Sequence, residues 1–234
     1  MFFDLNDQQR EFRKKVRQIY ETEVVPIVDE YERKEAFPIS LFRKLGEEHL
    51  LCLRCPKEYG GPGLDKVSEC ISNEELNRIC SGIGAGVMVH GGLATDPILR
   101  FGSEELKRRY LPAAARGEKI GSFALTEPNA GSDAAGIRTM ATKEGGGYRL
   151  NGLKTFITNG TICDFVTLSA YTHPEKRGHG EPLRRSQAIR FILAEMAMSL
   201  EVIRMEPFRR RYGKRLRIWV LLECIILKNS AVRV

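Results

Sequence analysis

The sequence predicts an α+β protein with two domains: a helical domain over residues 1–122 and a β domain over residues 123–234. Two patterns predict this arrangement. Apolar residues recur at helical spacing through the first half, and near residue 122 they change to short runs separated by Gly and Asn, which are typical of strands. The length of 234 residues is sufficient for two small domains.

Three helix starts precede residue 56. Asn6 can cap the first helix, and Gln9, three residues later, completes a capping box. Pro26 and Pro38 each fit the start of a further helix. The apolar residues expected on the helix faces are Phe12, Val16, Ile19, Tyr20, Leu41, Phe42 and Leu45.

The second part of the helical domain follows a loop over residues 56–63, which is rich in Gly and Pro. Residues 66–80 have a helical pattern, and residues 83–94, rich in Gly and Ala, indicate a closely packed helix. A short helix is expected to begin at Ser103 and to end near Pro112. The candidate core residues of the 66–80 helix are Val67, Ile71, Leu76 and Ile79.

The β domain is expected to begin with a strand over residues 122–126. Residues 148–150 and 153–158 indicate two strands of a hairpin, because Asn151-Gly152 suits a type I′ turn in which both residues have positive φ. Asn159-Gly160 repeats the turn signal, residues 145–147 indicate another turn between strands, and residues 165–170 indicate another strand.

Charge and hydropathy exclude several classes of protein. The formal net charge is +7, and residues 175–217 contain twelve Lys and Arg against five Asp and Glu, so the rest of the chain is neutral. A nucleic-acid-binding function of the whole protein is therefore not expected. The sequence has no apolar run long enough for a membrane span and no secretory signal at its N-terminus, so we expect a cytoplasmic protein.

The cysteines and histidines do not predict a metal site. Cys52 and Cys55 form a C-x-x-C pair, but a second pair or nearby His ligands would be needed for structural zinc. We interpret the cysteines as free thiols at small apolar positions. The four histidines are scattered and are expected to be structural or surface residues.

The segment with the clearest chemical character is Phe123-Ala124-Leu125-Thr126-Glu127-Pro128-Asn129-Ala130-Gly131-Ser132-Asp133. It reads as a strand followed by a bend rich in turn formers, whose amides and short polar side chains are exposed. Such a bend suits a flat ligand edge with many acceptors, such as a flavin pyrimidine ring or a phosphate. The same residues also fit an ordinary surface loop.

Four motifs together resemble the acyl-CoA dehydrogenase family over about residues 1–175. Thr-Glu-Pro-x-x-Gly-Ser-Asp begins at Thr126, and an aromatic-Ile-Thr-Asn-Gly motif begins at Phe156, where many members have Trp. The other two motifs are Tyr59-Gly60-Gly61-Pro62-Gly63 and Arg100-Phe101-Gly102-Ser103-Glu104-Glu105, the latter followed by Tyr110-Leu111-Pro112. The resemblance implies a helical N-terminal domain followed by an antiparallel β-barrel-like domain that holds the reactive ring of FAD.

The resemblance also implies roles for particular residues. Thr126 would hydrogen-bond the pyrimidine edge of the flavin, Phe156 would pack beside the ring, and Thr158 would hydrogen-bond near N5. Ser132 would lie where the tail of the CoA thioester passes. The full set of implied cofactor-binding residues is Phe123, Leu125, Thr126, Gly131, Ser132, Phe156, Ile157 and Thr158.

The reaction implied is the α,β-dehydrogenation of an acyl-CoA thioester, with an electron-transfer flavoprotein as the acceptor. In the family the carboxylate base and the tetramer interface belong to a C-terminal helical domain, which we do not expect within these residues. We therefore assign no catalytic residue, give neither Glu127 nor Asp133 the role of the base, and do not predict a homo-oligomer. Dehydrogenation by a fragment, or by a subunit completed by another chain, and a non-catalytic protein that binds flavin, acyl-CoA or a partner are the open alternatives. Related oxidases share these motifs, and the acyl chain length cannot be read from them.

Residues 176–222 match the family poorly. Residues 191–195 and 201–205 resemble two of its strands, but the turn between them is missing, and residues 209–215 are strongly basic. Residues 186–205 also fit a basic amphipathic helix, so a basic membrane-binding or nucleic-acid-binding segment at 176–217 is an alternative. A solvated basic face, or sequence altered by a change of reading frame, is the simpler interpretation. The last residues, 225–234, resemble a final strand of the β domain.

Overall fold

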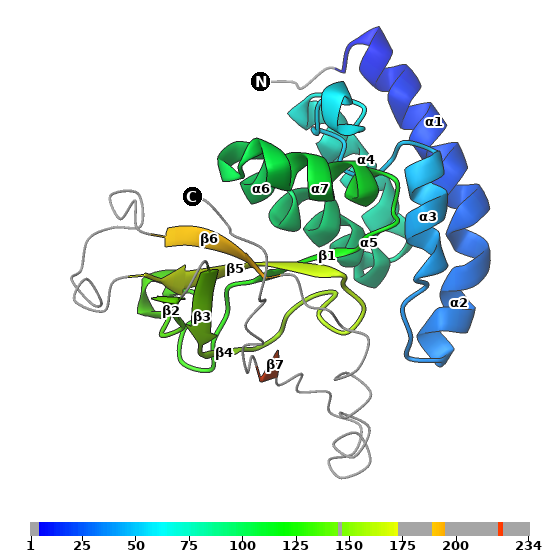
Figure 1. Cartoon of the computed structure of the whole chain (residues 1–234). Helices are drawn as coiled ribbons and strands as arrows, with labels where there is room; N and C mark the ends of the chain where they lie inside the picture. Colours follow the sequence, from blue (N-terminus) through cyan, green and yellow to red (C-terminus); the bar gives the residue numbers. More distant parts are fainter. Residues whose placement is uncertain (1–4, 145–146, 173–188, 195–219, 222–234) are drawn as a thin grey trace. The chain divides into compact units, whose positions relative to one another are not determined.

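The computed structural model describes residues 5–144, 147–172, 189–194 and 220–221. The chain divides into two compact units, Met1–Gly121 and Ser122–Val234. Helices form the first unit and strands dominate the second (Figure 1), which confirms the α+β order. No helix among these residues is both long and apolar enough to cross a bilayer.

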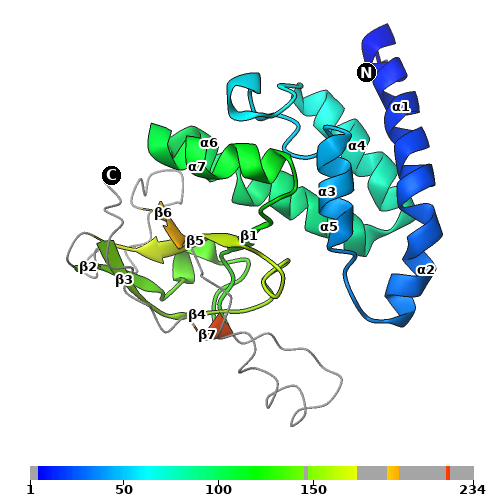
Figure 2. The ribbon, with the colours of Figure 1, turned by 45° about the vertical axis from the view of Figure 1, so that its right-hand side comes forward.

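The first unit is built from helices in sequence order. Asn6 caps the first of them, and the reciprocal bond from Gln9 completes the predicted capping box. The helices α1 and α4 pack against each other (Figure 2), with the hydroxyls of Tyr20 and Ser72 2.7 Å apart in their buried interface. The described helices are α1 (Asp7–Glu23), α2 (Val25–Arg33), α3 (Ser40–Glu47), the 3₁₀ turn η1 (Lys57–Tyr59), α4 (Lys66–Ile79), α5 (Ser81–Met88), the π-helical turn η2 (Val89–Ala94), α6 (Asp96–Phe101) and α7 (Glu104–Ala115).

The core face of α4 differs from the prediction. Ile71 and Leu76 are buried, but Val67 is 43% exposed in the first turn of the helix. Glu75 is buried instead, because Arg17 of α1 donates to both of its carboxylate oxygens at 2.9 Å. A charged residue therefore occupies a position in the core that hydrophobic periodicity could not identify.

The predicted end of the last helix near Pro112 is wrong. Proline removes one backbone donor, but α7 continues to Ala115, and the amide of Arg116 still donates to the Pro112 carbonyl at 3.2 Å. Leu111 and Ala114 are fully buried on either side of the proline. Packing of this final turn thus outweighs the local preference for an end.

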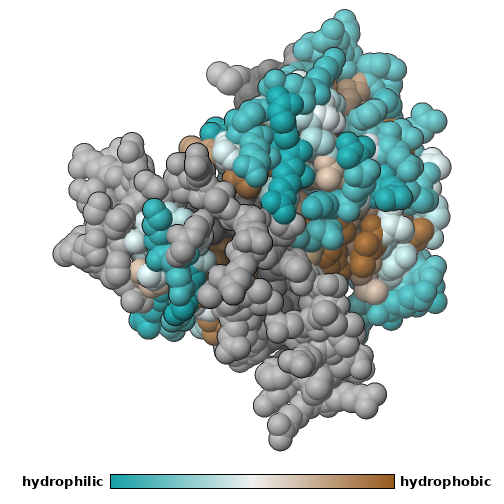
Figure 3. Space-filling model, in the orientation of Figure 1, coloured by the Kyte–Doolittle hydropathy of each residue, from teal (hydrophilic) through white to brown (hydrophobic). Residues whose placement is uncertain are grey.

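Most of the surface of the helical unit in Figure 3 is hydrophilic, with hydrophobic residues in a few places. Its large exposed apolar residues are Val25, Ile39, Val67, Met88, Leu93 and Phe101. The cysteines among the described residues are free thiols as predicted, and Cys52, Cys55 and Cys163 are buried; Cys224 lies outside these residues. Cys70 is exposed, so the prediction that it fills a small apolar position is wrong.

The second unit contains an open, mixed sheet. Its central strand is β5, whose seven residues are all buried and which pairs with β1, β2 and β6. The described strands are β1 (Gly121–Ala124), β2 (Met140–Glu144), β3 (Gly147–Asn151), β4 (Leu153–Lys154), β5 (Phe165–Tyr171), β6 (Ile189–Ala194) and β7 (Val220–Leu221), with the 3₁₀ turn η3 (Ala134–Gly136) between β1 and β2. The strands β4 and β7 form a separate antiparallel pair.

The expected antiparallel barrel-like arrangement is not what the described strands form. β2 pairs with β5 in parallel, with Met140 opposite Tyr171, while β5 and β6 are antiparallel. The described strands end in an open edge at β3. Strand patterns show which residues are extended but not how the strands pair. The closure into a barrel that the resemblance implied could therefore not be checked against them.

The predicted hairpin through Asn151-Gly152 is also wrong. β3 pairs with β2 instead, from Met140 opposite Asn151 to Glu144 opposite Gly147. Residues 145–146 of the turn predicted between strands lie outside the described residues. Neither Asn151 nor Gly152 has a positive φ. Gly152 is required for another reason: a Cβ there would lie 2.3 Å from Oγ1 of Thr139.

The predicted strand over residues 153–158 is shorter than expected, since β4 ends at Lys154. Phe156 has a φ of 56°, in the left-handed region, which is incompatible with an extended strand. Asn159, with a φ of 64°, continues the turn there.

Most of the poorly matching segment 176–222 lies outside the described residues. Within it, residues 189–194 form β6, which agrees with the expected strand near 191–195 and rules out a helix over these six residues. The strand expected at 201–205, the basic run 209–215, the strand expected at 225–234 and the remainder of the alternative helix lie outside the described residues.

Candidate functional site

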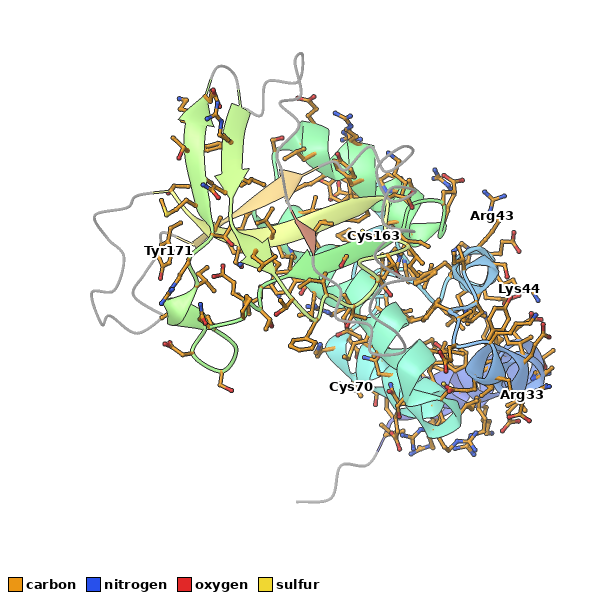
Figure 4. The ribbon with its side chains drawn as sticks, turned by 90° about the horizontal axis from the view of Figure 1, so that it is seen from below. Arg33, Arg43, Lys44, Cys70, Cys163 and Tyr171 are labelled. Carbon is orange, nitrogen blue, oxygen red and sulfur yellow. The ribbon has the colours of Figure 1, made fainter. Side chains whose placement is uncertain are left out.

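The polar bend after β1, residues 125–130, is closed by its own backbone. The amide of Glu127 donates to the Ala130 carbonyl at 2.8 Å, and the amide of Ala130 donates back to the Glu127 carbonyl at 3.1 Å. Ala130 is buried against Ile137 and Tyr171. Tyr171, at the end of β5, donates its hydroxyl proton to the carbonyl of Ala135 at 2.5 Å (Figure 4). The bend is therefore fixed from within and by the sheet beneath it.

The Glu127 side chain points inward and is saturated with donors. One carboxylate oxygen accepts from the amide of Thr139 at 2.9 Å, from the Thr139 hydroxyl at 2.6 Å and from the Lys154 ammonium at 2.8 Å. The other accepts from the amide of Arg138 at 2.5 Å. Burial alone would raise the pKa of Glu127, but the hydrogen bonds from Lys154, Thr139 and Arg138 outweigh it and lower the pKa. A carboxylate with these partners remains ionised and is unsuited to accept a proton from a substrate, so Glu127 remains unassigned as a base.

Lys154 is the partner that the sequence did not identify. Its side chain is 0% exposed, and besides Glu127 its ammonium donates to the carbonyl of Leu125 at 2.8 Å. Burial lowers the pKa of Lys154, and the bond to Glu127 opposes that shift. The available signal was a lysine inside an otherwise uncharged run predicted as a strand, but its partner lies 27 residues earlier, out of reach of any local pattern.

The two motifs lie side by side. The amide of Thr155 donates to the Thr126 carbonyl at 2.9 Å, and the Ser122 hydroxyl donates to the Thr158 carbonyl at 2.6 Å. Residues 154–158, hereafter the 154–158 segment, therefore run beside β1 and the 125–130 bend. The neighbouring turn contains Cys163, a buried thiol (Figure 4).

Beside this junction, one large aromatic side chain is exposed to solvent, which is unusual. Phe156 is 76% exposed although it is a large aromatic residue, and it adopts left-handed backbone. It is therefore not a core aromatic. Of the other predicted site residues, Gly131, Ser132 and Thr158 are exposed, Phe123, Leu125 and Thr126 are half-buried, and Ile157 is buried.

The arrangement offers a flat apolar ring, short hydroxyl side chains and backbone amides in one unit. Such groups can bind a planar ligand with a polar edge, in which the ring contributes stacking and the hydroxyls contribute hydrogen bonds. Asp133 is exposed. His90 is buried in the helical unit and His49 is exposed, as the structural or surface interpretation expected, while His173 and His179 lie outside the described residues.

Two family models match the chain in succession. The acyl-CoA dehydrogenase N-terminal domain matches residues 6–118, and the acyl-CoA dehydrogenase middle domain matches residues 122–213. The chain belongs to the acyl-CoA dehydrogenase family. The motifs at Thr126 and Phe156 thus identified the family correctly.

Similar proteins agree with this assignment. An acyl-CoA dehydrogenase of Bacillus subtilis is 42% identical over 176 residues, which are 75% of this chain and 46% of that protein. A crystal structure of an acyl-CoA dehydrogenase from Geobacillus kaustophilus has a TM-score of 0.75 and 34% identity, covering 84% of this chain and 50% of that one. An acyl-CoA dehydrogenase from Bacillus anthracis, complexed with FAD, has a TM-score of 0.67 and 38% identity, covering 72% of this chain and 29% of that one. The chain spans about half the length of the curated acyl-CoA dehydrogenase relatives it matches.

Proposed function

We propose that the junction between the 125–130 bend and the 154–158 segment binds the isoalloxazine ring of FAD, and that the chain takes part in α,β-dehydrogenation of an acyl-CoA thioester. The observation that carries the proposal is the hydrogen bond from Thr155 to Thr126, which brings the two motifs together. Family membership supports the cofactor, because a relative with 38% identity was crystallised with FAD.

The described residues fit a flavin in shape and polarity. Phe156 presents an exposed aromatic ring, and Thr126 and Thr158 carry hydroxyls on half-buried and exposed side chains. In this proposal Phe156 packs beside the ring, Thr126 hydrogen-bonds the pyrimidine edge, and Thr158 hydrogen-bonds near N5. Phe123, Leu125, Gly131 and Ile157 complete the surface.

When bound, FAD would supply the hydride acceptor for the substrate β carbon. The residues of this chain would orient the ring and shield one face from water. Ser132, exposed beyond the bend, is proposed to contact the tail of the CoA thioester. No described residue is assigned as the base, since Glu127 is held as an ion pair.

The partners follow from the same membership and are proposals. We propose an acyl-CoA substrate and an electron-transfer flavoprotein as the acceptor. A solved structure with 34% identity bears the name electron transferring flavoprotein of Acidaminococcus fermentans. We propose domain limits of 1–122 and 123–234.

Reduction of an activated double bond is a second candidate. A 3-(aryl)acrylate reductase of Clostridium sporogenes is 39% identical over 180 residues, and an acryloyl-CoA reductase (NADH) of Anaerotignum propionicum is 36% identical over 178 residues. In this candidate function the chain would use the same ring-binding residues, and hydride would pass from the reduced flavin to the double bond. Bleaching of the bound flavin by a saturated acyl-CoA favours dehydrogenation, whereas reoxidation of the reduced flavin by an enoyl-CoA alone favours reduction.

The test uses the purified full chain reconstituted with FAD. We expect a yellow protein whose flavin absorption differs from that of free FAD, and we expect Thr158→Ala to weaken FAD retention or shift that absorption. Thr161→Ala is the matched control, because Thr161 is also exposed but lies beyond the motif. A chain that stays colourless, or a Thr158 variant with unchanged affinity and spectrum, would contradict the placement of this segment against the ring.

A further inference from the structure

Lys154 is a fully buried cation at the point where the two motifs meet. Lysine is almost never fully buried unless it is paired, and here the ammonium reaches two groups of the bend. It donates to the Leu125 carbonyl and to the Glu127 carboxylate, each at 2.8 Å. These contacts join β4 directly to the segment that follows β1.

Glu127 is fixed independently of Lys154. Its carboxylate also accepts from the amides of Arg138 and Thr139 and from the hydroxyl of Thr139, where β2 begins. The anion therefore has a preset position, and the ammonium of Lys154 is drawn to that position. The result is a buried junction between three segments: the bend, the start of β2, and β4.

We propose that the buried Lys154–Glu127 pair positions the ring-binding surface, by holding the 154–158 segment against the 125–130 bend so that Phe156, Thr158 and Thr126 face one ligand. This inference rests on the proposed function. Lys154 and Glu127 are positioning residues, because both are buried and act through the exposed residues beside them.

Stability alone does not account for the pair. Desolvation of two charges offsets most of their attraction, so a buried ion pair contributes little compared with apolar residues of the same volume. The pair does fix the position of the Lys154 side chain, because one ammonium must donate to both the Leu125 carbonyl and the Glu127 carboxylate. The bond from Thr155 to Thr126 comes one residue after Lys154, so the position set by the ammonium is passed directly to the rest of the 154–158 segment.

Three variants separate positioning from stability: Lys154→Met, Glu127→Gln and the double variant. Lys154→Met leaves an unpaired buried carboxylate, and we expect it to lower the melting temperature and to weaken FAD binding by about tenfold or more. The double variant removes both charges, so we expect most of the melting temperature to return. FAD affinity should stay low in the double variant, because the ammonium bond to Leu125 is still missing.

The matched control is Arg149→Gln, which breaks the exposed pair with Glu144 on β2 and β3, where the side chains are 58% and 40% exposed. We expect this variant to match the parent chain in melting temperature, FAD affinity and flavin spectrum. Amide hydrogen exchange provides a readout that does not need FAD: the Thr155 amide should exchange faster in the double variant than in the parent chain.

The outcomes distinguish the two proposals. A parent chain that binds no FAD overturns the proposed function and this inference with it. A parent chain that binds FAD, together with a folded double variant that matches it in FAD affinity, flavin spectrum and Thr155 exchange, overturns the positioning role alone. Loss of affinity and Thr155 protection in the double variant, with recovered stability, supports it.

Discussion

His90 is a buried histidine whose replacement should change how the stability of the protein depends on pH. Its ring lies in η2, 0% exposed, with Nδ1 accepting from the amide of Gly121 at 2.9 Å and Nε2 donating to the Ala114 carbonyl at 3.0 Å. Phe42 packs edge-on, with ring centroids 5.0 Å apart, and the Cys52 sulfur lies 3.9 Å from Nε2. The pattern of bonds requires the neutral ring, because Nδ1 is an acceptor.

The magnitude follows from the pKa of this group. Burial lowers the pKa of His90 from 6.5 to about 4, opposed by the bond to Ala114. Between pH 6.5 and about pH 4, His90 binds a proton in the unfolded chain but stays neutral in the folded chain. The free energy of unfolding therefore falls as the pH falls. Each unit of pKa shift corresponds to about 1.4 kcal/mol, so His90 should account for a loss of about 3 kcal/mol in the free energy of unfolding between about pH 6.5 and pH 4.

The test compares His90→Gln with the parent chain by urea unfolding between about pH 7 and pH 4. At neutral pH the variant should be less stable by about 1–3 kcal/mol, because the Gly121 amide loses its acceptor. Carboxylates titrate equally in both proteins, so the difference in free energy of unfolding between parent and variant should narrow by about 3 kcal/mol as the pH falls. His49→Asn is the control, since His49 is exposed and Asn tolerates its left-handed φ of 56°. A gap that stays constant across this range would refute the assignment of a neutral, buried His90.

Two further predictions concern packing and thiol reactivity. Gly152→Ala should destabilise the β unit by about 1–3 kcal/mol in urea unfolding, because its Cβ would lie 2.3 Å from the Thr139 hydroxyl. Gly131→Ala, with nothing within 4 Å of the added Cβ, should stay within about 0.5 kcal/mol of the parent, and equal effects would contradict the packing argument. Native alkylation followed by peptide mapping should modify exposed Cys70 well before Cys52, where burial raises the pKa to about 12; equal rates would show that Cys52 is accessible.

Local signals predicted local structure well. The capping box of Asn6 and Gln9 was readable because both partners lie within one helical turn. The strand at β5 was readable because its apolar run is buried on both faces. Pro112 shows the limit of such signals: a residue that ends an isolated helix is retained when the following turn is buried.

Signals that depend on distant partners could not be read. The hairpin prediction placed the turn at Asn151-Gly152, but the register is set by β2, whose Met140–Glu144 run was not recognised as a strand. Glu75 of α4 is buried beside Arg17 of α1, a position that hydrophobic periodicity could not identify. The contact of Glu75 joins residues 58 positions apart. The β2–β3 partners, from Met140 opposite Asn151 to Glu144 opposite Gly147, are neighbours in the sequence, so that error came from the unrecognised strand.

The candidate site could be predicted in part from the sequence and in part only from the structure. Its motifs were visible in the sequence, and the burial and donors of Glu127 supply the physical reason why this residue is unsuited as a base. Lys154 could be found only from the structure, because nothing near it in the sequence indicates its partner. The family was therefore predictable, while the means of holding the two motifs together was not.

Phe156 and Lys154, two residues apart, are each unfavourable for stability, for opposite reasons: the apolar residue is exposed and the charged residue is buried. A left-handed backbone costs about 1–2 kcal/mol for a residue with a side chain, and a ring that is 76% exposed buries little surface to offset that cost. Lys154 shows the reverse, a charge removed from water where an apolar side chain would serve. Strained backbone and buried charges are retained together where a precise geometry is needed. Their coincidence on one short segment is thus an independent physical reason, apart from any motif, to place the ligand-binding surface at Phe156.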